Sequence, residues 1–191
     1  FILLFARFII GLNDSNDITH FNYSFVLLNI FLTAFIFNIN TILLRDISTN
    51  KSSKSFSFSI LISSLVAIFL YFIINNYSVY IIDLVYRRGA FSYDDVNSTA
   101  FFLRELTPYY IILMFTTLFL QPFFSLGIDK ISIYAKRFSL LISIVFASLI
   151  IFFFINDSDN ITSCLLFVQV MSVTALIISI FSYIYFLRNE V

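Results

Sequence analysis

The stretch FSFSILISSLVAIFLYFII, residues 56–74, contains no charged side chain and decides the fold class. A helix needs roughly 20 apolar residues to cross a hydrocarbon core about 30 Å thick. This stretch approaches that length, and polar residues flank it on both sides. It therefore predicts a membrane-spanning helix.

Further segments of similar character follow one another along the chain. They are residues 1–12, 21–44, 101–126, 138–155 and 161–187. A membrane barrel would need short segments in which apolar and polar residues alternate, and the sequence has none. We therefore predict an all-α, polytopic transmembrane helical bundle, with residues 1–191 in one membrane domain. We expect residues 1–12 to be the tail of a helix that begins upstream.

The composition agrees with a protein surrounded by lipid and excludes several function classes. Hydrophobic residues make up 60% and charged residues 12%, whereas soluble domains carry roughly 25% charged residues. Eleven basic and eleven acidic residues cancel, so no surface for nucleic acid is indicated. Cys164 lies in an apolar run and is expected to be an inert buried thiol. His20 has no metal-ligand spacing and no evident partner, so we expect no metal, no cofactor and no enzymatic activity.

Apart from Arg7, the basic residues fall into two sets of polar joints. One set, with the C-terminus, carries Arg45, Lys51, Lys54, Lys130, Lys136, Arg137 and Arg188. The other carries Arg87, Arg88 and Arg104. Because cytoplasmic loops are enriched in lysine and arginine, we expect the first set in the cytoplasm and the second outside.

The joint YRRGAFSYDD, residues 86–95, is expected outside although it holds two arginines. A structural interpretation accounts for this: Arg87 and Arg88 bind lipid phosphates at the interface. Gly89 permits a tight turn, and Asp94 and Asp95 favour the start of the next helix through its dipole.

Polar side chains recur on single faces of the predicted helices. Asn22, Asn29, Thr33 and Asn40 share one face of the helix 21–44, because spacings of seven and four residues return to nearly the same angle. A stripe of amides is costly against lipid, so it should face a water-filled cavity or a neighbouring helix. Both alternatives stay open for it and for similar candidates in later helices: Thr117, Gln121, Gln169 and Ser172.

Three joints resemble the lipid II flippase family of bacteria (MurJ/MviN). LVYRRGAFSYDDVNSTAFFLRELTPYYI, residues 84–111, is similar to a family segment in which a Tyr/Phe-x-x-Gly-x-Phe turn precedes an acidic stretch and a helix. LQPFFSLGIDKISIYAKR, residues 120–137, resembles the next cytoplasmic joint. NTILLRDIS, residues 40–48, resembles a Thr-Ile-Leu-Leu-Pro-x-Leu-Ser ending, with Arg45 in place of proline. The resemblance runs from about residue 17 to the C-terminus.

The resemblance implies a fragment of the second lobe of a two-lobed transporter in the bacterial cytoplasmic membrane. Such proteins move a polyprenyl-pyrophosphate-linked glycan, such as the peptidoglycan precursor lipid II, to the outer leaflet by alternating access. The implied partners are this lipid-linked glycan, membrane lipids and the missing N-terminal lobe. The polar stripes would line a cavity, while Arg87, Arg88 and Gly89 would form an outer gate that contacts phosphate.

One residue departs from the family pattern. Members usually have Ala-Asp-Arg-Leu with a cavity-facing arginine, and the matching positions here read Ser24-Phe25-Val26-Leu27. A divergent polysaccharide or drug exporter of the same superfamily, or a non-transporting membrane scaffold, therefore remain alternatives. Drug exporters normally need carboxylates within the membrane, whereas the acidic residues here lie in joints or near helix ends.

The charge distribution makes the topology testable with single cysteines in a Cys164→Ser background. Ser52→Cys and Ser132→Cys should be protected from an impermeant thiol reagent, because their joints are expected in the cytoplasm. Ser92→Cys and Ser158→Cys should react from outside. Labelling at Ser52 and Ser92 from the same side would contradict the predicted crossings.

Overall fold

The computed structural model describes residues 3, 6, 7, 10, 11, 15–50, 53–88, 91–125, 141, 144, 145 and 160–190. Four long helices account for most of them: α2 (Ser15–Asn50), α3 (Ser53–Tyr86), α4 (Tyr93–Ser125) and α6 (Asn160–Glu190). No strand occurs within these ranges. The all-α prediction is confirmed for the part of the chain that the structure describes.

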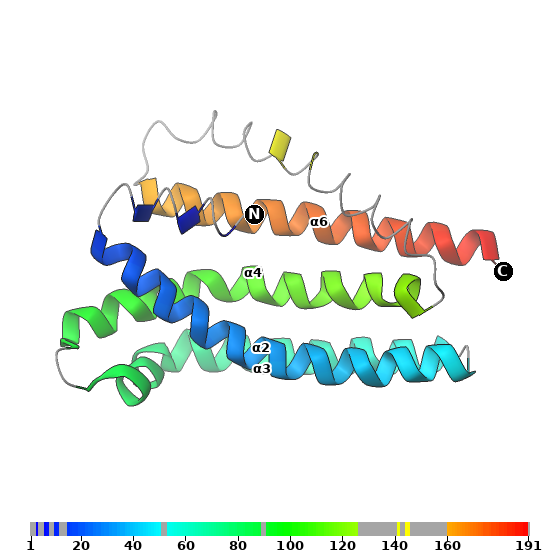
Figure 1. The fold of residues 1–191 in the computed structure, drawn as a ribbon, viewed down its shortest axis with the longest axis horizontal. Helices are drawn as coiled ribbons and strands as arrows, with labels where there is room; N and C mark the ends of the chain where they lie inside the picture. The colour runs from blue at the N-terminus through cyan, green and yellow to red at the C-terminus, as the bar shows by residue number, and fades with distance from the viewer. Residues whose placement is uncertain are drawn as a thin grey trace.

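Helix α4 lies at the centre of the bundle (Figure 1). It contacts α2, α3 and α6, and α2 also contacts α3. The chain reverses between α2 and α3 and again between α3 and α4, so α2 and α4 run in the same direction. Helix α6 also runs in that direction. In the view of Figure 1, α6 lies on one side of α4, and α2 and α3 lie on the other.

The core follows from this arrangement, because α4 buries apolar side chains toward several neighbours. Its buried apolar residues are Val96, Ala100, Phe102, Leu103, Leu106, Tyr109, Tyr110, Met114, Leu118 and Leu120. Phe102 meets Phe21 of α2 edge to face, with ring centroids 5.9 Å apart. Ile82 of α3 and Met171 of α6 belong to the same buried cluster. One buried cluster therefore joins the four helices, and a second, smaller one packs Leu118 against Phe56.

The helices are longer than the apolar segments that predicted them. Residues 75–100, which lie between the predicted crossings 56–74 and 101–126, are mostly helical, because α3 continues to Tyr86 and α4 begins at Tyr93. Asn76 does not end α3; its Nδ2 donates to the carbonyl of Phe72 at 2.7 Å. A fall in hydropathy along the sequence indicates that the side chains meet a more polar environment. The helix itself ends where its backbone hydrogen bonds end. As predicted, Asp94 and Asp95 lie in the first turn of α4.

Two helices are long and apolar enough to cross a membrane: Phe56–Tyr86 in α3 and Cys164–Ile184 in α6. Only 22% of the most apolar 18-residue segment of α3 is buried. The core helix of a soluble protein would be mostly buried. Large side chains such as Ile68 and Phe69 are exposed along it, as on a surface that meets lipid or a partner. The crossings expected over 21–44 and 101–126 stay predictions. Those over 1–12 and 138–155 lie largely outside the described residues.

The ends of the helices separate the basic residues in the way that the charge rule assumes. Arg45 lies near the end of α2, Lys54 at the beginning of α3 and Arg188 at the end of α6, all at one end of the bundle. Arg87 and Arg88 follow α3 at the opposite end. Lys51 and the basic residues of 130–137 lie outside the described residues.

Packing of α4 makes a prediction about stability. Leu106→Ala removes a side chain that is 1% exposed and should lower the free energy of unfolding by about 2–5 kcal/mol, because a cavity remains. Leu84→Ala on α3, where the leucine is 79% exposed, is the matched control and should change it little. The measurement is unfolding in detergent micelles. Equal losses in the two variants would contradict a core centred on α4.

Candidate functional site

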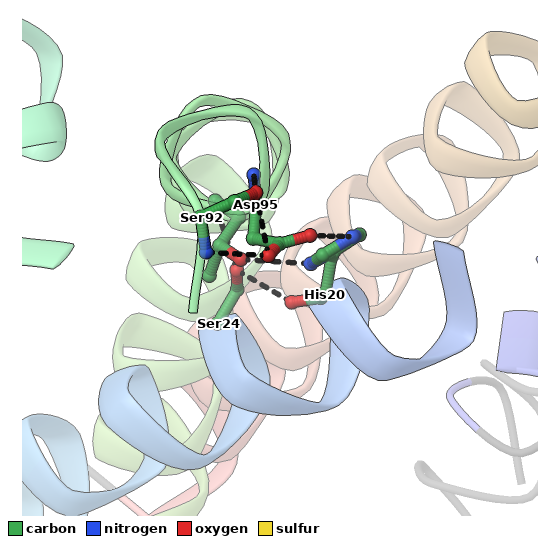
Figure 2. Close-up of polar contacts among 5 residues, drawn as sticks. His20, Ser24, Ser92 and Asp95 are labelled. Atoms are coloured by element: carbon green, nitrogen blue, oxygen red, sulfur yellow. Dashed lines mark hydrogen bonds and ion pairs between the residues drawn. The ribbon is translucent and has the colours of Figure 1, made fainter. Parts of the chain in front are cut away.

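A polar cluster joins α2 to the start of α4 (Figure 2). The ring of His20 is buried between two side chains of α4. Its Nδ1 lies 3.1 Å from Oγ1 of Thr99, and its Nε2 lies 3.6 Å from Oδ1 of Asp95. One turn later, Oγ of Ser24 donates to the carbonyl of Thr99 at 2.6 Å and to that of His20 at 3.0 Å. We call these four residues the His20 cluster.

Local sequence explains how each helix presents its part of the cluster. His20 and Ser24 are four residues apart, as are Asp95 and Thr99, so each pair occupies one helix face. Ser92 caps α4, because its Oγ accepts from the N–H of Asp95 at 3.2 Å. In return, Oδ2 of Asp95 accepts from the N–H and from the Oγ of Ser92, both at 2.7 Å. This reciprocal capping box fixes the carboxylate beside His20.

The same bonds set the ionisation of Asp95. The side-chain hydrogen bond from Ser92 and then its backbone N–H lower the pKa of Asp95, and His20 adds a smaller lowering contribution. The carboxylate is therefore held in its charged form, which is the form that attracts a cation or a hydrogen-bond donor.

The order Thr99, His20, Asp95 is that of a hydroxyl, an imidazole and a carboxylate, as in a hydrolase relay. However, Thr99 is 0% exposed, so its hydroxyl is closed to solvent in this structure. What these contacts show is a tie between α2 and α4. Among the described residues, no group of three His, Cys, Asp or Glu side chains is placed to hold a metal ion.

A cavity of about 410 Å³ opens beside the His20 cluster, next to the turn between α3 and α4. We call it the turn cavity. Three aromatic rings form one part of its wall: Tyr23 lies 4.8 Å from Tyr86 and 5.6 Å from Phe91 between ring centroids. The hydroxyl of Tyr86 donates to the carbonyl of Tyr23 at 3.2 Å. The polar lining consists of Asn16, Thr19, His20, Arg88 and Asp95.

The structure separates the two arginines of the predicted gate. Arg87 pairs with Asp83 through Nη1 and Oδ1 at 2.9 Å, and its guanidinium lies 5.9 Å from the centre of the Tyr93 ring. Arg88 is exposed and lines the turn cavity. Gly89 lies outside the described residues. Of the pair, Arg88 is thus the cation that faces a hollow.

Two further cavities lie between α3 and α4 and share the lining residues Tyr71, Asn75 and Pro108. The first, of about 350 Å³, has polar walls that include Arg104, Glu105 and Thr107. The second, of about 580 Å³, is almost entirely apolar and is lined by Ser64, Ala67, Ile68, Phe72, Asn76, Ile111, Ile112 and Phe115 besides the shared residues. We call the two together the α3–α4 groove.

Of the polar side chains predicted to line a cavity, those that the structure describes do not line these three cavities. On α2, Asn22 is half-buried, Asn29 is exposed and the hydroxyl of Thr33 donates to the carbonyl of Asn29. The side chains of Asn40 and Gln121 lie outside the described residues.

The candidates on α4 and α6 make hydrogen bonds within the bundle. The hydroxyl of Thr117 donates to the carbonyl of Met114 at 2.8 Å, within its own helix. That of Ser172 donates to the carbonyl of Gln169 at 2.6 Å, also within its own helix. Gln169 differs, because its Nε2 donates across to the carbonyl of Glu105 on α4 at 3.0 Å. For Gln169 the observed bond is the interhelical alternative.

The expectation that His20 has no partner is wrong. Its partners, Thr99 and Asp95, lie more than 70 residues further along the chain. The sequence carried a local signal, since each helix places two polar residues four apart near its beginning. Nothing local indicates that these two faces meet, because that depends on how α2 packs against α4.

The chain matches no family model, no curated protein and no solved structure.

The capping box makes a prediction about pH. Ser92→Ala should lower the free energy of unfolding by about 1 kcal/mol at neutral pH, the usual value for a lost N-cap. A lowered carboxylate pKa contributes stability that is present above the unfolded pKa, about 3.9, and is lost as the pH falls through the folded pKa. The difference in free energy of unfolding between the parent and Ser92→Ala should therefore become smaller when the pH is lowered below about 4.

The matched control is Ser182→Ala, which removes a hydroxyl bonded to the carbonyl of Ile178 within α6. Its effect should be small and independent of pH. Unfolding in detergent at neutral and acidic pH measures both variants. A loss at Ser92 that is the same at both pH values would contradict the proposed coupling to Asp95.

Proposed function

We propose that this chain is part of a transporter that moves a polyprenyl-pyrophosphate-linked glycan, lipid II or a similar precursor, from the inner to the outer leaflet of a bacterial cytoplasmic membrane. The observation that carries the proposal is the turn cavity with Arg88 in its wall. It adds to the resemblance of three joints and to two helices that are long and apolar enough to cross a membrane.

The lining of the turn cavity suits a phosphate-linked sugar. Among the described residues, no carboxylate pairs with Arg88, so its guanidinium can bind two oxygens of a phosphate through two parallel hydrogen bonds. Asp95 accepts hydrogen bonds of the kind that sugar hydroxyls donate. The rings of Tyr23 and Phe91 offer apolar surface to the C–H groups of a sugar. A cavity of about 410 Å³ is within the usual range for small-molecule sites.

The proposal also assigns a role to the contacts at this end of the bundle. Alternating access requires one end of the transporter to open while the other is closed. The His20 cluster and the aromatic rings join α2 to α4 and to the turn. Water can replace polar contacts of this kind at a small net cost, because the lost hydrogen bonds are re-formed with solvent. This end is therefore suited to open and close.

The face of α2 with the amide stripe supports the same proposal. Asn29 and Val26 are exposed in the described part of the molecule, so this face is available to line a cavity shared with another lobe. Val26 supplies no charge where the family has an arginine. In our proposal, cations elsewhere contact the phosphate, and Arg88 is one of them.

Flux through the reconstituted protein tests the proposal. In proteoliposomes of the full-length protein, Arg88→Gln should lower the flipping rate of a polyprenyl-pyrophosphate-linked glycan roughly tenfold or more. This is the effect of losing a charge-assisted hydrogen bond worth about 1.5–3 kcal/mol. Arg87→Gln should have a smaller effect, because Asp83 already neutralises Arg87.

Arg45→Gln, at the opposite end of the bundle, is the control and should keep the parental rate. Thermal unfolding checks that each variant is folded. A folded Arg88→Gln protein that flips at the parental rate would exclude the proposed role of the turn cavity. A full-length parent that moves no lipid-linked glycan would favour the scaffold alternative, and transport of a drug instead would favour the exporter.

A further inference from the structure

The α3–α4 groove combines two environments in two adjoining cavities. Its polar part is lined by Arg104, Glu105 and Thr107, and its apolar part is lined mainly by aliphatic and aromatic side chains. Tyr71, Asn75 and Pro108 belong to both parts and mark where they meet. The combination is complementary to an amphiphile, with a polar group at one end and a chain along the other.

Arg104 is the group in the polar part that can recognise an anion. It is exposed, and its Nε donates to the carbonyl of Ala100 at a long 3.4 Å. No carboxylate in the described ranges pairs with its guanidinium. The planar guanidinium therefore keeps donors available in the fork geometry that fits a phosphate.

The apolar part has the properties of a site for a hydrocarbon chain. Small side chains, Ser64 and Ala67, line the α3 wall, while Ile111, Ile112 and Phe115 line the α4 wall. The volume of about 580 Å³ is open to the surface on the side of α3 where Ile68 and Phe72 are exposed. In a membrane this surface meets lipid tails, so the acyl chain of a neighbouring lipid reaches the groove first.

By the predicted crossings, the two parts also lie at the depths that a lipid requires. Arg104 is about one helical turn inside the predicted crossing 101–126, and Asn75 immediately follows the predicted crossing 56–74. The predicted crossings therefore place both residues near the boundary between headgroups and acyl chains on the side of the α3–α4 turn, although the apolar helix of α3 continues to Tyr86. The apolar lining continues from there toward the middle of both helices.

We propose that the α3–α4 groove is a binding site for an anionic phospholipid of the leaflet next to the α3–α4 turn. Arg104 holds the phosphate, and one acyl chain occupies the apolar part. The inference rests on the membrane location in the proposed function, but it does not rest on transport. It names a resident lipid and a site distinct from the turn cavity.

Lipid-dependent stabilisation of the full-length protein tests the site. The protein in a neutral detergent is titrated with dioleoylphosphatidylglycerol or with dioleoylphosphatidylcholine, and its melting temperature is followed. Phosphatidylglycerol should stabilise the parent at lower concentration than phosphatidylcholine, because its net negative charge is complementary to Arg104. For Arg104→Gln the concentration that gives half of the stabilisation should rise about tenfold or more. Arg104→Lys should recover part of the loss.

Two further variants separate the headgroup from the chain. Ala67→Phe fills the apolar part and should weaken the stabilisation by both lipids. Arg87→Gln changes a residue at the same end of the bundle but outside the groove, so the stabilisation by phosphatidylglycerol should stay unchanged. Glycerol 3-phosphate tests the headgroup alone and should give no comparable shift. Equal stabilisation by glycerol 3-phosphate would show a site for free phosphate and overturn the lipid assignment.

An Arg104→Gln protein that responds to phosphatidylglycerol like the parent would also overturn the proposal, whatever the outcome of the transport assay. Conversely, parental flux in Arg88→Gln would remove the role of the turn cavity and leave the lipid site intact. A protein that does not incorporate into bilayers would exclude the membrane location and, with it, both proposals.

Discussion

Packing of α4 against three other helices holds the turn cavity and the α3–α4 groove in position. The start of α4 carries Asp95 and Thr99 to the ring of His20, and its α3-facing side forms one wall of the α3–α4 groove. Between helices in lipid, close packing and hydrogen bonds replace the hydrophobic effect as the source of association. Polar ties such as the bond from Ser24 to Thr99 therefore contribute to positioning that burial alone would not fix in a bilayer.

Local features of the structure were predictable from the sequence. The apolar runs gave the existence of the helices, Asp94 and Asp95 marked the start of α4, and Cys164 is buried as expected. Hydropathy failed for the true length of α3, because Asn75 and Asn76 continue the helix beyond its apolar part. The polarity of a side chain indicates whether it meets water or an apolar environment. Backbone hydrogen bonding decides where the helix ends.

Features that depend on the approach of distant segments were not predictable from one sequence. The partners of His20 and the α3–α4 groove arise from packing between helices, and no local pattern encodes which faces meet. The same limit applies to Gln169, for which the sequence left both cavity lining and interhelical bonding open. Only the position of α4 shows that its amide meets a carbonyl.

The two proposals both depend on which arginines are free of an ion pair with a carboxylate. A phosphate binds a guanidinium most readily where no carboxylate is already paired with it, and Arg87 is paired with Asp83. Arg88 and Arg104 have no such partner among the described residues, and each lines a hollow, one beside α2 and one beside α3. Available positive charge is thus distributed over two sides of α4 toward the end near the α3–α4 turn, where anionic groups of different origin can be held apart.

The bond between Gln169 and α4 has a consequence for how the sequence can drift. Its acceptor is the main-chain carbonyl of Glu105, a group that every amino acid supplies. Selection for this contact therefore places no demand on the side chain at position 105, whereas position 169 needs an amide of sufficient reach. Divergent copies of the gene should accumulate substitutions unequally at the two ends of a single bond, and a comparison of side chains alone would fail to reveal that the helices are joined there.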